Sequence, residues 1–154
     1  MIHSGKNKKT NLYFKFRKLG FKLNLVFSNC GLFGDIFMGL DLKSRKLVIA
    51  DGGINVSLRH TIELADLRGI AVKKVYKSIR AGELNVRNMA DFILSIHIRL
   101  EFQDGKAAIV LAVCENNGVQ IKNMQKVERQ LAKWYSMLSR LISHSPGRLA
   151  EIAS

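Results

Sequence analysis

The chain has 154 residues, of which 47% are hydrophobic and 24% are charged, and it contains a single proline. This composition suits one globular domain with a real core and excludes Pro-rich linkers. Lys and Arg outnumber Asp and Glu 25 to 12, giving a net charge of +13, which favours polyanionic partners such as phospholipid headgroups, nucleic acid or an acidic protein. A soluble protein that simply carries much lysine is the alternative.

Cysteine usage and hydropathy indicate a cellular compartment. Cys30 and Cys114 lie far apart and lack a metal-ligand spacing, so they predict no disulfide framework and favour a reducing compartment. Polar, lysine-rich sequence follows Met1 without the apolar core of a signal peptide. The most apolar window, residues 25–40, is shorter than the ~20 residues of a membrane-spanning helix. We expect a cytoplasmic protein, with peripheral attachment to a membrane as an option.

The N-terminal third is basic, with no acidic residue before Asp35. Residues 1–10 are polar and are expected to be disordered. Residues 11–19 fit two patterns, because their aromatic residues alternate with basic ones as in a strand, whereas Leu12, Phe16 and Leu19 would also form a helical stripe. Residues 21–27 alternate more regularly and predict a strand, and the Ser-Asn-Cys-Gly sequence that follows predicts a turn.

The middle of the chain predicts short strands joined by turns. Residues 35–42 and 45–51 resemble a hairpin with its loop near Lys43-Ser44, and Asp51-Gly52-Gly53 breaks its second strand. Further strands are predicted for residues 56–64 and 69–76, with a short connector over residues 65–68. Residues 77–90 show no strong period and are expected to be irregular.

The clearest structural signal is a long hairpin over residues 91–114. Its first strand, FILSIHIRLEF, alternates apolar and polar residues, and Asp104-Gly105 is a strong signal for a type I′ turn. The turn and the hydrophobic pattern agree on one register. That register pairs Phe102 with Ala107, Leu100 with Ile109, Ile98 with Leu111, Ile96 with Val113 and His97 with Ala112.

An amphipathic helix is predicted for roughly residues 120–143. Its apolar stripe consists of Ile121, Met124, Val127, Leu131, Trp134, Leu138 and Leu141. Its opposite side carries Lys122, Lys126, Arg129, Lys133 and Arg140. The stripe is best explained as a core contact and the basic side as a solvated face.

These elements sum to about seven antiparallel strands and one C-terminal helix, a mainly β fold with α. The strand series from Phe21 to Cys114, the segment from Thr61 to Ile70 and the helix with Trp134 resemble, in their order, the pleckstrin-homology-like (PH-like) superfold. That superfold is a bent seven-stranded barrel or sandwich capped by a C-terminal helix. The resemblance implies a PH-like domain over residues 20–143, a basic N-terminal arm over residues 1–19 and a tail over residues 144–154.

No catalytic or metal site is predicted. The four histidines lie in no metal motif and beside no nucleophile at a recognised spacing. His60 and Glu63 would point to opposite faces of a strand, and Asp51-Gly52-Gly53 lacks the Lys-Ser/Thr of a phosphate loop. We therefore expect a non-catalytic protein that needs no cofactor.

The candidate ligand-binding residues are cationic and form three groups. They are Lys15, Arg17 and Lys18, then Lys43, Arg45 and Lys46, and then Lys73, Lys74, Lys77 and Arg80. In lipid-binding pleckstrin-homology domains, basic residues near the early strand loops hold inositol phosphates. The sequences Lys43-Ser44-Arg45 and Lys15-Phe16-Arg17 are similar to a fragment of that pattern.

Two classes of partner follow from these cations. A binding module with a basic surface would contact an anionic membrane or an acidic protein. Alternatively, the N-terminal arm and the basic helix face would bind nucleic acid, with Tyr13, Phe14 and Phe16 stacking on bases. A core position for these three aromatic residues competes with the stacking hypothesis. The oligomeric state is left open.

Overall fold

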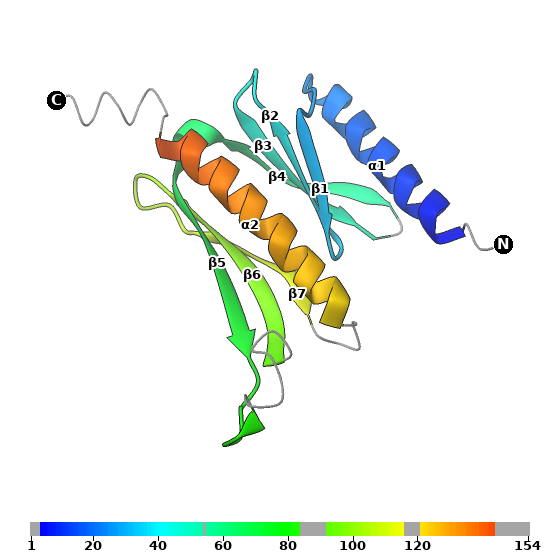
Figure 1. The fold of residues 1–154 in the computed structure, drawn as a ribbon. Coiled ribbons are helices and arrows are strands. Elements are labelled where there is room, and N and C mark those ends of the chain that lie inside the picture. The colour runs from blue at the N-terminus through cyan, green and yellow to red at the C-terminus, as the bar shows by residue number, and fades with distance from the viewer. Residues whose placement is uncertain (1–3, 54, 84–91, 116–120, 144–154) are drawn as a thin grey trace. The chain divides into compact units, whose positions relative to one another are not determined.

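The computed structural model describes residues 4–53, 55–83, 92–115 and 121–143 of the chain (Figure 1). The elements are α1 (Ser4–Lys22), β1 (Asn29–Phe33), β2 (Ile36–Asp41), β3 (Lys46–Gly52), β4 (Val56–Glu63), a 3-10 turn η1 (Leu64–Asp66), β5 (Leu67–Tyr76), β6 (Ile93–Phe102), β7 (Ile109–Glu115) and α2 (Ile121–Ser143). The expected seven antiparallel strands and C-terminal helix are confirmed. Among the described strands, two open sheets form and no ladder closes them into a barrel.

The chain divides into two compact units, Met1–Leu64 and Ala65–Ser154. The first unit holds α1 and the sheet β1-β2-β3-β4, and the second holds the sheet β5-β6-β7 and α2. Each sheet belongs to one unit, so each unit can be described by itself. The predicted boundary between residues 19 and 20 falls inside α1.

The strand predicted for residues 21–27 is wrong, because α1 extends to Lys22 and an ordered helix stop follows it. Asn24 adopts a left-handed conformation with φ of 60°. The Leu25 N–H donates to the Gly20 carbonyl at 2.8 Å and the Asn24 N–H donates to the Phe21 carbonyl at 3.1 Å. These two bonds form a Schellman motif, which satisfies the last carbonyls of the helix. Residues Ser4–Thr10, expected to be disordered, continue the helix backbone at its other end.

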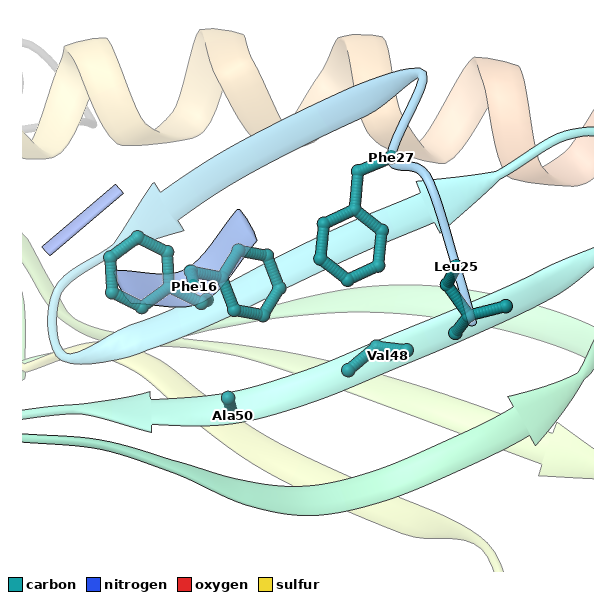
Figure 2. Close-up of a cluster of buried hydrophobic side chains, with 6 residues drawn as sticks. Phe16, Leu25, Phe27, Val48 and Ala50 are labelled. Carbon is teal, nitrogen blue, oxygen red and sulfur yellow. The ribbon is translucent and has the colours of Figure 1, made fainter. Parts of the chain in front are cut away.

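The inner face of α1 packs on one face of the β1–β4 sheet. Figure 2 shows the buried cluster at this contact, with Phe16, Phe27 and Val48 among its members. Phe16 is fully buried and stacks on Phe27 and Phe37, with ring centroids 4.6 Å and 4.8 Å away. A Cβ atom at Gly39 of β2 would lie 2.8 Å from the Phe16 ring, so a glycine at this position allows the helix to approach the sheet closely. The helical alternative for residues 11–19 is therefore confirmed.

The two central strands of the first sheet, β2 and β3, are buried on both faces, whereas β4 is largely exposed. Met38, Leu40 and Ile49 lie on the face away from Phe16 and are also fully buried. Burial on both faces explains why β2 and β3 lack the alternation of a half-exposed strand. The predicted β2–β3 hairpin is confirmed, whereas the turn predicted for residues 28–31 is wrong, since β1 begins at Asn29 and pairs with β2.

The predicted hairpin of the second unit is confirmed in its turn and in most of its register. Asp104 and Gly105 have φ of 62° and 71°, as a type I′ turn requires. The pairs Leu100–Ile109, Ile98–Leu111 and His97–Ala112 form as expected. A β-bulge between Ile96 and His97 places Ile96 opposite Cys114, so the Val113 pairing is wrong. The Phe102–Ala107 pair is also absent, because β7 begins only at Ile109.

The amphipathic helix α2 begins within one residue of its predicted start and packs against β5. Met124, Leu131, Trp134, Leu138 and Ile142 are buried, as the predicted stripe requires, with Ile142 as an unexpected member. The side chain of Ile121 lies outside the described residues. Residues 77–83, which follow β5, form no helix or strand apart from one residue in a 3-10 conformation. The rest of the segment that was predicted to be irregular lies outside the described residues.

Candidate anion-binding surface

The helix α1 presents aromatic and basic side chains on the side opposite its packed face. Phe14 and Phe21 are 65% and 61% exposed, and Arg17, Lys18 and Lys22 are exposed between and beside them. In a helix of 3.6 residues per turn, positions 14, 18 and 21 project away from position 16. Because Phe16 holds the inner face against the sheet, the outer face is left to solvent.

The C-terminal end of α1 lies at the same end of the first unit as the β2–β3 turn (Figure 1). The centroids of the Tyr13 and Phe37 rings lie 5.3 Å apart. Phe16, about one turn later in the helix, lies against Gly39, which is two residues later in β2. The helix therefore runs in the direction of β2. Two further exposed apolar side chains lie at this end, Val26 at 67% exposure and Leu42 at 44%. We define the α1 outer surface as Phe14, Arg17, Lys18, Phe21, Lys22, Val26, Leu42 and Lys43.

A buried carboxylate, that of Asp41, joins the two segments at this end. Its Oδ2 accepts a hydrogen bond from the Val26 N–H at 2.9 Å, and its Oδ1 accepts one from the Ser44 N–H at 3.0 Å. The residue is only 4% exposed. The Ser44 and Val26 N–H groups lower the pKa of Asp41, because they stabilise the charged carboxylate. Asp41 thus fixes the β2–β3 turn against the segment that leaves α1.

Of the three cations predicted to bind a ligand at the β2–β3 turn, only Lys43 is exposed. Arg45 is half-buried with φ of 54°. Lys46 is the first residue of β3 and forms an ion pair with Glu63 of β4, in which Lys46 Nζ lies 3.5 Å from Glu63 Oε1. Lys15 on α1 is half-buried, in contrast to Arg17 and Lys18. Among the described side chains of α1 and the β2–β3 turn, the exposed cations are therefore Arg17, Lys18 and Lys22 on the helix and Lys43 in the turn, and of these Lys22 was not among the predicted candidates.

The four candidate cations of the second unit do not form one group. Lys73 is exposed on β5 opposite His97, whereas Lys74 alternates to the other face and pairs with Glu128 of α2. The Lys77 Nζ lies 5.6 Å above the centroid of the Phe92 ring, a cation–π contact. The Arg80 backbone N–H donates to the Glu83 carboxylate.

An open groove of about 460 Å³ lies between β5 and α2 in the second unit. The residues that line it are Ile70, Ala71, Val72, Lys74, Glu128, Ala132, Tyr135 and Ser136. Its two opposite charges, Lys74 and Glu128, bond to each other across the groove. That pairing neutralises the cation, so the groove is mainly apolar and carries no net attraction for an anion.

Replacement of Glu128 by glutamine is expected to lower the free energy of unfolding by no more than about 1 kcal/mol at neutral pH, because both side chains are about one-third exposed. The hydrogen bond that Lys74 Nζ donates to Glu128 Oε1 raises the pKa of Lys74. The contribution of this ion pair to stability is therefore complete below the pKa of lysine in the unfolded chain, about 10.4. It is lost as the pH rises through the raised pKa of Lys74 in the folded protein. Urea unfolding at rising pH should show wild type and Glu128→Gln converging in alkali. A difference that grows with pH would contradict this.

The described residues show little that resembles catalytic machinery. Ser95 Oγ lies 2.9 Å from His97 Nε2 on the polar face of β6, an isolated pair rather than a triad. Burial raises the pKa of the Cys30 thiol, which disfavours the reactive thiolate, although Arg17 opposes this shift. Within residues 4–53, 55–83, 92–115 and 121–143, no three His, Cys, Asp or Glu side chains gather as metal ligands.

The stacking hypothesis for the three N-terminal aromatic residues is wrong for two of them. Phe16 is fully buried and Tyr13 is half-buried against Phe37, whereas Phe14 alone is exposed. Sequence reasoning also missed the exposure of Phe21 and Val26, which it placed in a strand. The helical spacing of 14, 18 and 21 against 12, 16 and 19 was the available signal.

Neither helix in the described residues combines the length and hydropathy that a bilayer-spanning helix requires. Comparisons of the chain with protein-family models, with curated proteins and with solved structures each found no match.

Proposed function

We propose that this protein is a non-catalytic, PH-like binding module whose first unit attaches peripherally to an anionic membrane through the α1 outer surface. Seven antiparallel strands followed by a C-terminal helix support the PH-like assignment. The observation that carries the function is the set of exposed cations Arg17, Lys18 and Lys22 on one ordered helix. No acidic residue occurs anywhere before Asp35, so no carboxylate of this segment opposes them.

The charge on this surface is sufficient for useful binding without a specific pocket. Each basic residue near an anionic bilayer contributes on the order of 1 kcal/mol. The four cations of the α1 outer surface, Arg17, Lys18, Lys22 and Lys43, would together strengthen partitioning by roughly a thousandfold. Docking of α1 on the sheet holds three of them in place before binding, which reduces the entropy lost on association.

The double substitution Arg17→Gln/Lys18→Gln is expected to weaken binding to phosphatidylserine vesicles by roughly 30-fold, because it removes two cations from the contact. Co-sedimentation with sucrose-loaded vesicles measures this partitioning. The matched control is Lys126→Gln/Lys133→Gln, which removes the same charge from exposed positions of α2. The proposal predicts that the control binds nearly as wild type does.

Equal losses in both double variants would show that net charge alone drives binding, and would contradict a surface on α1. Absence of wild-type binding to anionic vesicles at low salt would remove the membrane function altogether. Binding retained by the Arg17→Gln/Lys18→Gln variant and lost by the α2 variant would assign the contact to the second unit.

Nucleic-acid binding is the second candidate, and the exposed Phe14 beside Arg17 and Lys18 is the observation that favours it. Stacking of successive bases needs several exposed rings, whereas Phe16 is in the core and Tyr13 packs half-buried against it. A gel-shift titration with single-stranded DNA would distinguish the two functions, since phosphate contacts give a steep dependence on salt. Tight binding to DNA together with no binding to vesicles would favour the nucleic-acid function.

A further inference from the structure

We infer that Phe14 and Phe21 are bilayer anchors, which enter the boundary between headgroups and acyl chains when α1 docks on an anionic membrane. The inference rests on the proposed function and adds an apolar, salt-resistant component to it. It favours a lipid partner, because a bilayer offers a continuous apolar layer beneath its charged headgroups that can receive both rings at once.

The two rings occupy one side of the helix at the spacing that simultaneous insertion requires. They are seven residues apart, which is two helical turns and about 10 Å along the axis. Both are more than 60% exposed, at 65% and 61%. Val26, at 67% exposure, follows shortly after the helix end. A planar bilayer surface can receive both rings without bending of the helix.

These side chains have no role in the core of the first unit. Phe16, Phe27 and Phe37 make the aromatic contacts that hold α1 on the sheet, and Phe14 and Phe21 lie on the other side of the helix. Scattered single apolar residues are normal on a surface, but two exposed phenylalanines share one side of α1 with exposed basic residues. Aromatic and cationic side chains in this combination bind the bilayer interface.

The cations around the rings match the headgroup layer. Arg17 and Lys18 lie between the two phenylalanines along the helix, and Lys22 follows Phe21. Long basic side chains extend toward phosphates while their aliphatic stems lie along apolar groups. The arrangement therefore places rings in the apolar layer and charges among headgroups in a single orientation of α1. This charge complementarity selects an anionic bilayer over a neutral one.

The test compares Phe14→Gln/Phe21→Gln with wild type in vesicle co-sedimentation at about 0.1 M and about 1 M salt. High salt shortens the Debye length to about 3 Å and removes most of the charge contribution. Loss of the two rings is expected to weaken binding by about tenfold or more at both salts. Wild type should retain measurable binding at high salt, and the variant should lose it.

The control replaces two exposed apolar residues of the second unit, Leu94 and Val110, which are 42% and 52% exposed. Leu94→Gln/Val110→Thr should bind vesicles as wild type does. A direct readout comes from Phe21→Trp, whose added fluorescence should be quenched by brominated lipid. The native Trp134 is only 8% exposed and contributes the same background in both proteins.

Several outcomes separate failure of the anchors from failure of the membrane function. Normal binding by Phe14→Gln/Phe21→Gln with no quenching at position 21 would overturn the anchors and leave charge-driven docking intact. No wild-type binding at low salt would overturn both. A concentration-dependent dimer that dissociates in the double phenylalanine variant would assign the rings to a second copy of the chain and overturn the inference.

Discussion

Replacement of Phe16 by alanine is expected to lower the free energy of unfolding by about 3–5 kcal/mol, the range for a large aromatic side chain removed from a core. Phe16 is fully buried, and its ring stacks on Phe27 and Phe37 at the contact between α1 and the sheet. Gly39 lies against the same ring and has no side chain that could move into the cavity. Chemical unfolding followed by circular dichroism measures the loss.

The same substitution two residues earlier is the control. Phe14 is 65% exposed on the opposite side of the helix, so Phe14→Ala should change the free energy of unfolding by less than about 0.5 kcal/mol. Similar effects of the two substitutions would contradict the assignment of an inner and an outer face to α1. A small effect of both would show that α1 does not pack on the sheet.

Replacement of Asp41 by alanine is expected to lower the free energy of unfolding by about 1–3 kcal/mol, because it leaves the Val26 and Ser44 N–H groups without their carboxylate acceptor. Asparagine at this position should have a smaller effect, since its one amide oxygen can still accept a bond. Asp35→Asn, at an exposed carboxylate on the opposite end of β2, is the control and should be nearly neutral.

The pH dependence of this effect has a defined sign. The pKa of Asp41 is lowered in the folded protein. The contribution of its carboxylate to stability is therefore complete above the pKa of aspartate in the unfolded chain, about 3.9, and is lost as the pH falls through the lowered pKa of the folded protein. Unfolding measured from neutral pH into acid should show wild type and Asp41→Asn converging. A difference that persists unchanged in acid would contradict the role of the charged carboxylate.

The second unit was the more predictable part of the fold, because its signals are local. Asp104 and Gly105 specify the turn and thereby the register beside it, and alternation from Ile96 to Leu100 specifies the buried face. The alternation does not extend to the start of β6, where Ile93 is buried and Leu94 is exposed. The bulge after Ile96 was not predictable, since the alternation of β6 continues across it. The apolar stripe of α2 specifies that helix almost to the residue.

The first unit was less predictable, because one pattern there has two explanations. The alternation from Phe21 to Phe27 comes from the end of a helix and the segment that turns back after Asn24, and not from a strand. Exposed phenylalanines also weaken the amphipathic signal of α1, since apolar residues occur on both of its sides. Tertiary packing of Phe16 decides between the alternatives, and sequence period alone does not.

The candidate surface was predictable in its charge and not in its composition. Arg17, Lys18 and Lys43 were singled out as cations, and all three are exposed. Lys46 and Lys74 were equally plausible from sequence, but their partners Glu63 and Glu128 are distant along the chain. The pairing of β3 with β4 and of α2 with β5 brings those carboxylates near, and such contacts are not encoded in local spacing.

Hydrogen–deuterium exchange of the full chain, with and without phosphatidylserine vesicles, tests most directly whether α1 packs inward and binds membranes outward. The account predicts protected amides over residues 16–23 in the free protein, since α1 is docked there. Vesicles should slow exchange further over residues 14–28 and 42–45 and leave β6 unchanged. Rapid exchange of α1 in the free protein, or vesicle protection confined to the second unit, would contradict it.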